Sequence, residues 1–173
     1  MLNRIGAKAT TPEDAVGLLL DCHDRIRSFL ALSRRLAEAA PGDPGVADAA
    51  ARVARYFREA LPLHARDEEE SILPRLRGVD AEVDAALAEM EHEHETHGPP
   101  LAALVVACDA IAAEPGRLPE FAPELARAVT HLDDHFAAHL RREEAVVFPA
   151  MRRLLSPADD AAIVREIRAR RGA

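Results

Sequence analysis

The sequence has few aromatic residues and few cysteines. Its 173 residues include no tryptophan, one tyrosine and two cysteines, and only 3% of them are aromatic. A core of this composition is packed by small and branched side chains, and the abundance of Ala, Leu, Arg and Glu is typical of helices. Cys22 and Cys108 are too few for a disulfide framework in a chain of this length, and each falls in an apolar helical pattern. We therefore expect an all-α protein with two ordinary buried thiols.

Positive charge and long apolar runs are also scarce. The net charge is -8 and the isoelectric point is near 5.5, whereas nonspecific binding of nucleic acid requires a cationic face. The longest clean apolar run, residues 101–108, is too short to span a bilayer, and residues 1–10 lack the apolar core of a secretory signal. These features predict a soluble, cytoplasmic protein that binds neither nucleic acid nor a membrane.

Proline and glycine divide the sequence into four long helical patterns and one short pattern. The expected helices cover about residues 12–40, 44 to between 74 and 78, 80–113 and 119–155, and the short helix covers about 157–171. Short connections favour antiparallel neighbours, so we expect an up-down-up-down four-helix bundle with a short C-terminal fifth helix. The expected organisation is a flexible N-terminus over residues 1–11, the bundle over 12–155 and a tail helix over 156–173.

Helix starts and interruptions can be read from capping residues and prolines. Thr11 and the proline after it predict the start of the first helix, and Ser156 with its following proline predicts the start of the tail helix. Pro62 predicts a kink in the second helix. Pro99 and Pro100 stand together within the third helix and predict a break or kink, because neither has a backbone donor.

One motif occurs twice in the chain. His64 is followed four residues later by Glu68, and His139 is followed four residues later by Glu143; each His is followed by a proline ten residues on. Positions i and i+4 share one face of a helix, so each copy directs an imidazole and a carboxylate to the same side. Both copies fall on apolar faces, where this combination has the spacing of metal ligands.

The other two long helices each carry a histidine within an apolar stripe, His23 in the first and His94 in the third. A four-helix bundle therefore brings four imidazoles and two carboxylates to one level of its core, a usual place for a metal site. These ligands suit iron, manganese or zinc, and two glutamates able to bridge favour two metal ions over one.

The motifs resemble those of the hemerythrin-like (HHE cation-binding) domain over about residues 12–155. The segments that carry the resemblance are Cys22-His23-Asp24-Arg25-Ile26, His64 to Glu69 with Leu73-Pro74, Glu93-His94, and His139 to Glu144 with Phe148-Pro149. The resemblance implies a four-helix bundle around two non-haem iron ions joined by an oxo or hydroxo bridge. It also implies reversible O2 binding, or chemistry with O2, NO or peroxide.

Carried over by position, the resemblance implies a specific ligand set. The terminal ligands would be His23, His64, His94 and His139, and the bridging ligands would be Glu68 and Glu143. Oxygen-carrying hemerythrins use a fifth His one turn from the third-helix ligand, but Met90 and Gly98 stand one turn from His94 here. His97, three residues on, could substitute, and His135 could be a fifth ligand or a residue that orients one. Without a fifth His, the set resembles the bacterial branch linked to iron-sulfur repair and nitrosative stress.

Several neighbouring residues are open to two readings. Glu69 and Glu144, each directly after a motif Glu, are expected to support the metal ligands from behind or to lie on the helix surface. Tyr56 could donate a hydrogen bond to a bound oxygen species, although an ordinary packing position is also consistent with its place. Phe57 and Phe136 are expected to keep the pocket dry.

The function expected from the sequence is binding, sensing or relay of O2 or a related small oxidant such as NO or peroxide. Two alternatives share the same site: a di-iron oxidoreductase or iron-sulfur repair protein for nitrosative stress, and an iron or zinc storage or regulatory module. Whether the protein is an enzyme is left open. The tail helix is the expected contact of a homodimer.

Overall fold

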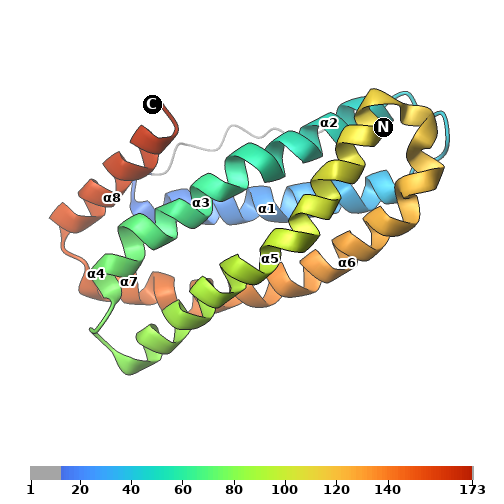
Figure 1. The fold of residues 1–173 in the computed structure, drawn as a ribbon. Helices are drawn as coiled ribbons and strands as arrows, with labels where there is room; N and C mark the ends of the chain where they lie inside the picture. The colour runs from blue at the N-terminus through green and yellow to red at the C-terminus, as the bar shows by residue number, and fades with distance from the viewer. Residues whose placement is uncertain (1–12, 173) are drawn as a thin grey trace.

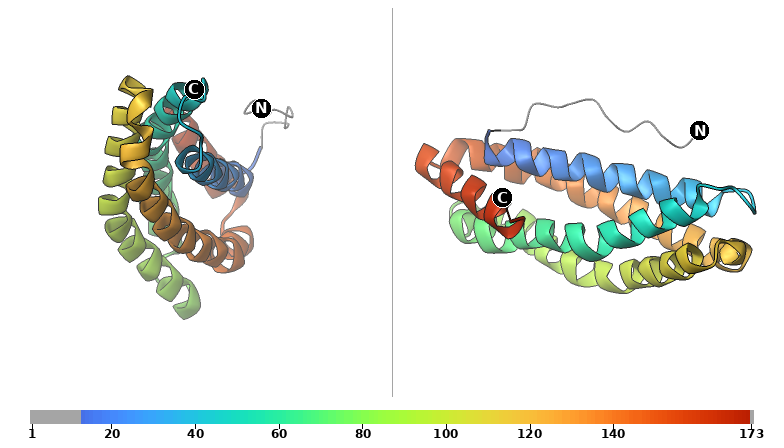
Figure 2. Two further views of the ribbon diagram at one scale, coloured as in Figure 1. Left: turned by 90° about the vertical axis from the view of Figure 1, so that its right-hand side faces the viewer. Right: turned by 90° about the horizontal axis from the view of Figure 1, so that it is seen from above.

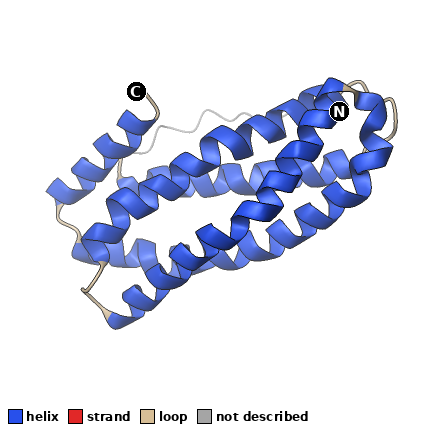
Figure 3. Cartoon of the chain, viewed as in Figure 1, coloured by secondary structure: helices blue, strands red, loops and turns tan. Residues whose placement is uncertain are grey.

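The computed structural model describes residues 13–172, which form helices joined by short connections (Figure 1, Figure 3). The helical elements form five rods. They are α1 (Ala15–Ala37); α2 (Val46–Arg55), η1 (Tyr56–Ala60), α3 (Leu61–Asp67), η2 (Glu68–Ile72) and α4 (Leu73–Leu76); α5 (Ala81–Ala113); α6 (Leu118–Arg142), η4 (Glu143–Val147) and α7 (Phe148–Leu154), preceded by the short η3 (Pro115–Arg117); and α8 (Pro157–Arg170). The expected flexible segment, residues 1–11, lies outside the described residues.

Four long rods lie side by side and alternate in direction (Figure 2). α2 packs against α1 and α5, and α6 packs against the same two helices, so each rod has two neighbours around a common core. α8 folds back across one end of the bundle, against α1, α3 and η2. The predicted fold class, an all-α four-helix bundle with a short fifth helix, is confirmed.

The tail helix begins as the sequence indicates. Ser156 accepts a hydrogen bond from the backbone of Asp159, whose side chain accepts one in return from the Ser156 backbone, which is a capping box. The apolar face of α8, formed by Ile163, Val164 and Ile167, is buried against the bundle of its own chain. A contact with a second subunit through α8 would therefore have to use its other face.

The start of α1 differs from the expectation. The N-cap is Asp14, whose carboxylate accepts a hydrogen bond from the backbone N–H of Gly17 at 2.6 Å. Asp is as good a cap as Thr, and it stands closer to the first buried residue, Ala15. Thr11 itself lies outside the described residues. The helix ends at Ala37, three residues before the expected end.

α5 runs unbroken through its two consecutive prolines, so of the expected break or kink the break is wrong. Pro99 and the preceding Gly98 are exposed, and the carbonyls that lose their donors belong to the exposed residues Glu95 and Thr96. Carbonyls on the solvent side of a helix can tilt outward and be hydrated, so the helix survives there. By length and composition α5 is the one helix among residues 13–172 that could cross a membrane; it packs here between α2 and α6.

Three prolines each follow a five-residue π-helical segment instead. Pro62 comes two residues after η1, Pro74 two residues after η2, and Pro149 two residues after η4. Proline lacks the N–H of a regular turn and its ring clashes with the carbonyl four residues earlier. The wider π turn moves that carbonyl away, so the second and fourth rods continue past their prolines.

Two apolar clusters fill the bundle on either side of a layer of polar side chains. On α1, Leu19 belongs to one cluster and Ile26 to the other, and His23 lies between them. On the second rod, Leu61 and Ile72 likewise belong to different apolar clusters, and the polar layer lies between them. Polar groups in this layer are withdrawn from water, so each of them requires a partner.

Candidate metal centre

Six predicted metal ligands meet in this polar layer, and every long rod contributes at least one. They are His23 of α1, His64 of α3, Glu68 at the start of η2, His94 of α5, His139 of α6 and Glu143 at the start of η4. Five of them are at most 3% exposed, and the side chain of His94 is 11% exposed. The sequence-based expectation that four helices bring these side chains together is therefore met in the structure.

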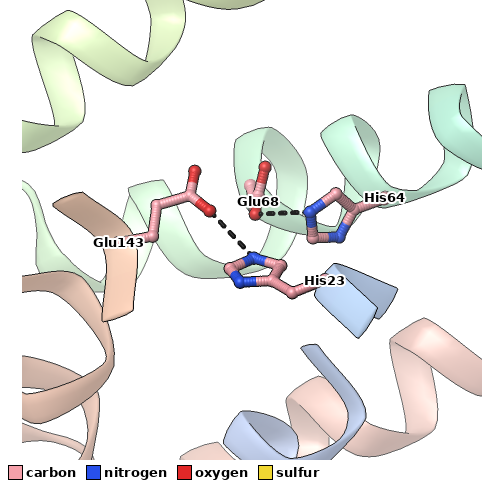
Figure 4. Close-up of side chains that lie close together, drawn as sticks. All are labelled: His23, His64, Glu68 and Glu143. Atoms are coloured by element: carbon pink, nitrogen blue, oxygen red, sulfur yellow. Dashed lines mark ion pairs between the residues drawn. The ribbon is translucent and has the colours of Figure 1, made fainter. Parts of the chain in front are cut away.

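Each glutamate divides its two oxygens between two histidines on different helices. Glu68 Oε1 lies 3.1 Å from Nε2 of His64, and its Oε2 lies 3.2 Å from Nε2 of His94. Glu143 behaves in the same way: Oε2 lies 3.0 Å from Nε2 of His23, and Oε1 lies 3.0 Å from Nε2 of His139. Figure 4 shows the His23–Glu143 and His64–Glu68 pairs pointing toward one another.

The six residues thereby form two groups of four that share both carboxylates. The groups are His23, His64, Glu68 and Glu143, and Glu68, His94, His139 and Glu143; within each group one ligand atom per residue lies within 4.8 Å of the others. Two cations held in this way would each receive two imidazole nitrogens and two carboxylate oxygens. Shared carboxylates offset the repulsion between two metal ions about 3.5 to 4 Å apart.

The hydrogen-bonding state of these atoms also fits a bound cation. Despite their short contacts with one another, Nε2 of His23, both ring nitrogens of His64 and both oxygens of Glu68 and of Glu143 are buried without a hydrogen bond of ordinary geometry among residues 13–172. A buried polar atom left unpaired costs about 1 to 3 kcal/mol, and more when it is charged. A pair of cations would satisfy Nε2 of both histidines and all four carboxylate oxygens at once.

In three of the four histidines, the ring nitrogen that points away from the centre contacts a second carboxylate. The Nδ1 contacts are His23 with Glu144, His94 with Glu69 and His139 with Glu93, each at 2.8 Å. With Nδ1–H donating to a carboxylate, the lone pair of Nε2 faces the centre, and the carboxylate makes the imidazole a more basic ligand. Of the two readings of Glu69 and Glu144, the structure supports the one in which they orient metal ligands.

Glu93 was not assigned a role from the sequence. It is 9% exposed, and its Oε2 accepts hydrogen bonds from Nδ1 of His139 at 2.8 Å and from Arg142 at 2.7 Å. Burial raises the pKa of Glu93, but Arg142 and His139 outweigh that effect, so its pKa lies below the usual range. Neighbouring residues on a helix point about 100° apart, so Glu93 faces α6 while His94 faces the second rod. In the sequence, the only indication that Glu93 orients a histidine was its position directly before His94.

Glu68 and Glu143 occupy equivalent backbone positions. Glu68 is the first residue of η2 and Glu143 the first residue of η4, and the carbonyl of each accepts a hydrogen bond from the N–H five residues later. Such π turns are frequent at functional sites because they change the direction of successive side chains. Here they allow two consecutive glutamates to reach different sides of the centre, one facing inward and the other holding a histidine ring.

Burial and charge shift the pKa values of the candidate metal ligands strongly. Burial, followed by repulsion from Glu143, raises the pKa of Glu68 to about 8. Burial lowers the pKa of His64 to about 3, whereas at His94 the carboxylates of Glu68 and Glu69 outweigh burial and raise the pKa to about 9. Without metal the centre therefore holds protons at neutral pH, and a cation that binds there must displace them.

His97 and His135 lie outside both groups of four. The His97 ring packs 4.5 Å from the Phe136 ring and 5.5 Å from the His139 ring, and its Nε2 is buried without a partner. His135 lies 5.7 Å from His97 and is half-buried. Six of the seven predicted ligands are thus brought together, and a ligand role for His97 stays a prediction.

Cys22 and Tyr56 line a smaller cavity of about 180 Å³ that also reaches His64. Cys22 is half-buried instead of buried; burial raises the pKa of its thiol, and its Sγ lies 3.7 Å from Nη2 of Arg171. Tyr56 is stacked on Phe29 with the ring centres 4.0 Å apart, which is a packing position. Cys22 belongs to neither ligand group.

A larger cavity of about 380 Å³ opens onto the centre. His64, His94 and His139 all line it, whereas His23 does not, so the cavity reaches the pair His94 and His139 on one side of the shared carboxylates. Phe57 and Phe136 line the same space, as expected for residues that exclude water.

A four-helix bundle with two shared carboxylates and four imidazoles in its core defines a class of cation-binding proteins. The sequence model of the hemerythrin HHE cation binding domain matches residues 14–118, more than half of the chain, and the chain belongs to this family. The match includes His23, His64, Glu68 and His94, and the tertiary structure adds His139 and Glu143 from beyond it. No curated protein sequence matches the chain.

Proposed function

We propose that this protein holds two non-haem iron ions and uses them to bind O2 or a related small oxidant such as NO or peroxide, for binding, sensing or relay. The observation that carries the proposal is the division of oxygens at Glu68 and Glu143, which supports a pair of ions over a single one. A set of imidazole and carboxylate ligands without thiolate suits iron. When bound, two reduced iron ions supply two electrons to an oxidant.

The residues around the centre support access from one side. Each ion would receive four protein donors, two from histidines and two from shared carboxylates, which leaves positions for an external ligand on six-coordinate iron. His94 and His139 line the larger cavity, so a small oxidant would approach the ion held by these two residues. Phe57 and Phe136 exclude water along that path.

A di-iron oxidoreductase is the second candidate function. The observation that favours it is the size of the cavity, about 380 Å³, which exceeds the needs of a diatomic ligand. It would turn over repeatedly in the presence of a reductant, whereas a carrier or sensor would form a stable and reversible adduct. The cytoplasmic location and the homodimer contact through the tail helix stay predictions.

The test is a metal analysis combined with an ultraviolet-visible spectrum of the anaerobically reduced protein, before and after exposure to air. About two irons per chain, with charge-transfer bands that appear in air and disappear under vacuum, would support reversible O2 binding. Two irons that oxidise irreversibly would favour the oxidoreductase. Zinc, or no metal at all, would contradict the di-iron proposal.

A further inference from the structure

The larger cavity is lined by two kinds of side chain. The apolar lining residues include Phe57, Leu61, Leu101 and Phe136, and the histidines of the lining are His64, His94, His97 and His139. Its volume of about 380 Å³ lies within the range of small-molecule sites, roughly 300 to 1,000 Å³, and an apolar cavity of roughly 150 Å³ already accepts benzene. The space therefore accommodates a ring-sized organic molecule beside the centre.

His97 gives this cavity a polar atom that is left unpaired. The side chain is 3% exposed, and its Nε2 has no hydrogen-bond partner in the part of the chain that the structure describes. It belongs to neither group of candidate metal ligands, and its ring is held against Phe136 at 4.5 Å. A buried polar atom that lines a cavity in this way is completed by a ligand with a matching polar group.

The charged side chains at the opening offer no unpaired cation to an anionic ligand. The lining contains one arginine and no lysine; Arg66 is already paired with Glu70 at 2.7 Å, and the ring of His94 is paired with Glu69 at 2.8 Å. Glu69 and Glu95 also line the cavity and add negative charge. A carboxylate ligand would meet these two glutamates and no unpaired arginine or lysine of the lining, so a neutral molecule is favoured.

The ring nitrogen of His97 limits which polar group the ligand can carry. Nε2 is buried and unpartnered among residues 13–172, so the ligand must be able to pair with either tautomer of the imidazole. Nε2 of a neutral imidazole is a donor in one tautomer and an acceptor in the other. A hydroxyl group matches either tautomer, because it can both donate and accept a hydrogen bond.

We propose that this cavity binds a neutral, single-ring molecule with one hydroxyl group, its ring between Phe57 and Phe136 and its hydroxyl on Nε2 of His97. This site goes beyond the binding of a small oxidant and does not depend on it. A molecule bound there would lie next to the candidate metal centre.

The test compares phenol with toluene, which has nearly the same shape but no hydroxyl, by calorimetric titration of the full-length protein as purified. Phenol should bind about threefold to tenfold more tightly than toluene, the range expected for one neutral hydrogen bond. His97→Phe keeps a ring and removes the nitrogen, so it should abolish the advantage of phenol and leave toluene binding unchanged. The matched control is His135→Phe, which alters the neighbouring ring outside the cavity and should change neither affinity.

A second variant tests the cavity independently of His97. Leu101→Trp, at a half-buried position of the lining, should fill the space and reduce the binding of both compounds at least tenfold. Unchanged binding in this variant, equal affinities of phenol and toluene for the unmodified protein, or no binding of either would overturn the proposal. A new visible charge-transfer band with phenol would place the hydroxyl on iron and overturn the role of His97. Because the titration can be repeated on zinc-loaded protein, a protein without iron would defeat the proposed function and leave this test intact.

Discussion

Glu93 and His139 join α5 to α6 through a buried contact of 2.8 Å between Oε2 and Nδ1. The same carboxylate oxygen accepts a hydrogen bond from Arg142 at 2.7 Å. One residue of the third rod thus orients a candidate metal ligand of the fourth. The contact makes the geometry of the centre dependent on the relative position of the two helices.

Glu93→Gln should weaken metal binding about tenfold to 100-fold, because carboxylates that orient a ligating histidine have effects of this size. The measurement is competition with a chelator of known affinity. Glu95→Gln is the matched control, since Glu95 stands two residues away on the exposed side of α5. Equal affinities in the two variants would show that Glu93 does not act on His139.

Replacing a direct ligand should have a larger effect. His94→Ala removes one of the two imidazoles on the cavity side and should lower the metal content by at least one ion per chain, as measured by elemental analysis. His92→Ala removes an exposed histidine of the same helix and should leave the metal content unchanged. Full metal content in His94→Ala would reject the assignment of the second ligand group.

The metal-free protein should lose stability as the pH rises from about 6.5 to 8. The pKa of Glu68 is raised to about 8 and that of His94 to about 9, so the folded state binds more protons than the unfolded state in this window. Stability then falls with rising pH by up to about 1.4 kcal/mol per pH unit for each such proton. Burial lowers the pKa of His64 to about 3 and that of His97 to about 4; their opposing effect ends about one pH unit above 6.5, where the imidazoles of the unfolded chain have lost their protons.

This pH dependence can be followed by urea unfolding of chelator-treated protein at several pH values. Glu68→Gln should flatten the profile and increase the stability of the metal-free protein near pH 8, because it removes a carboxyl group whose ionisation is opposed by burial and by Glu143. If the free energy of unfolding of the wild-type protein stayed constant or rose from pH 6.5 to 8, the raised pKa values of Glu68 and His94 would be contradicted.

The tail helix should stabilise the second rod through a buried ion pair. Asp67, which directly precedes Glu68, is 0% exposed and is bound by Arg170 at 3.0 Å and by Arg171 at 2.6 Å. Replacing both arginines by alanine leaves a buried carboxylate unpaired and should lower the free energy of unfolding by about 3 to 5 kcal/mol. Asp67→Asn in the same background should restore part of the loss, and Arg165→Ala, on the exposed face of α8, should have little effect in urea unfolding.

Much of the fold could be predicted because the signals are local. Apolar spacings of three and four, together with the breaks near residues 41–45, 77–80 and 114–117, predicted the long helices to within a few residues. The doubled motif placed His64 with Glu68 and His139 with Glu143 on common faces, because positions i and i+4 of a helix always share a side. The break expected at Pro99 and Pro100 was wrong, because the local rule does not consider whether the freed carbonyls face solvent.

The apolar spacings specify which side chains of each helix face the core, and therefore that imidazoles and carboxylates meet there. The packing of the helices specifies how they meet: which two histidines each glutamate contacts, the support of His139 by Glu93, and the cavity beside His97. Contacts between helices depend on the rotation and axial position of each rod. Here the packing of the two apolar clusters and the π turns at Glu68 and Glu143 set the rotation and the axial position of the rods. The spacing of residues within a single helix does not encode these two quantities.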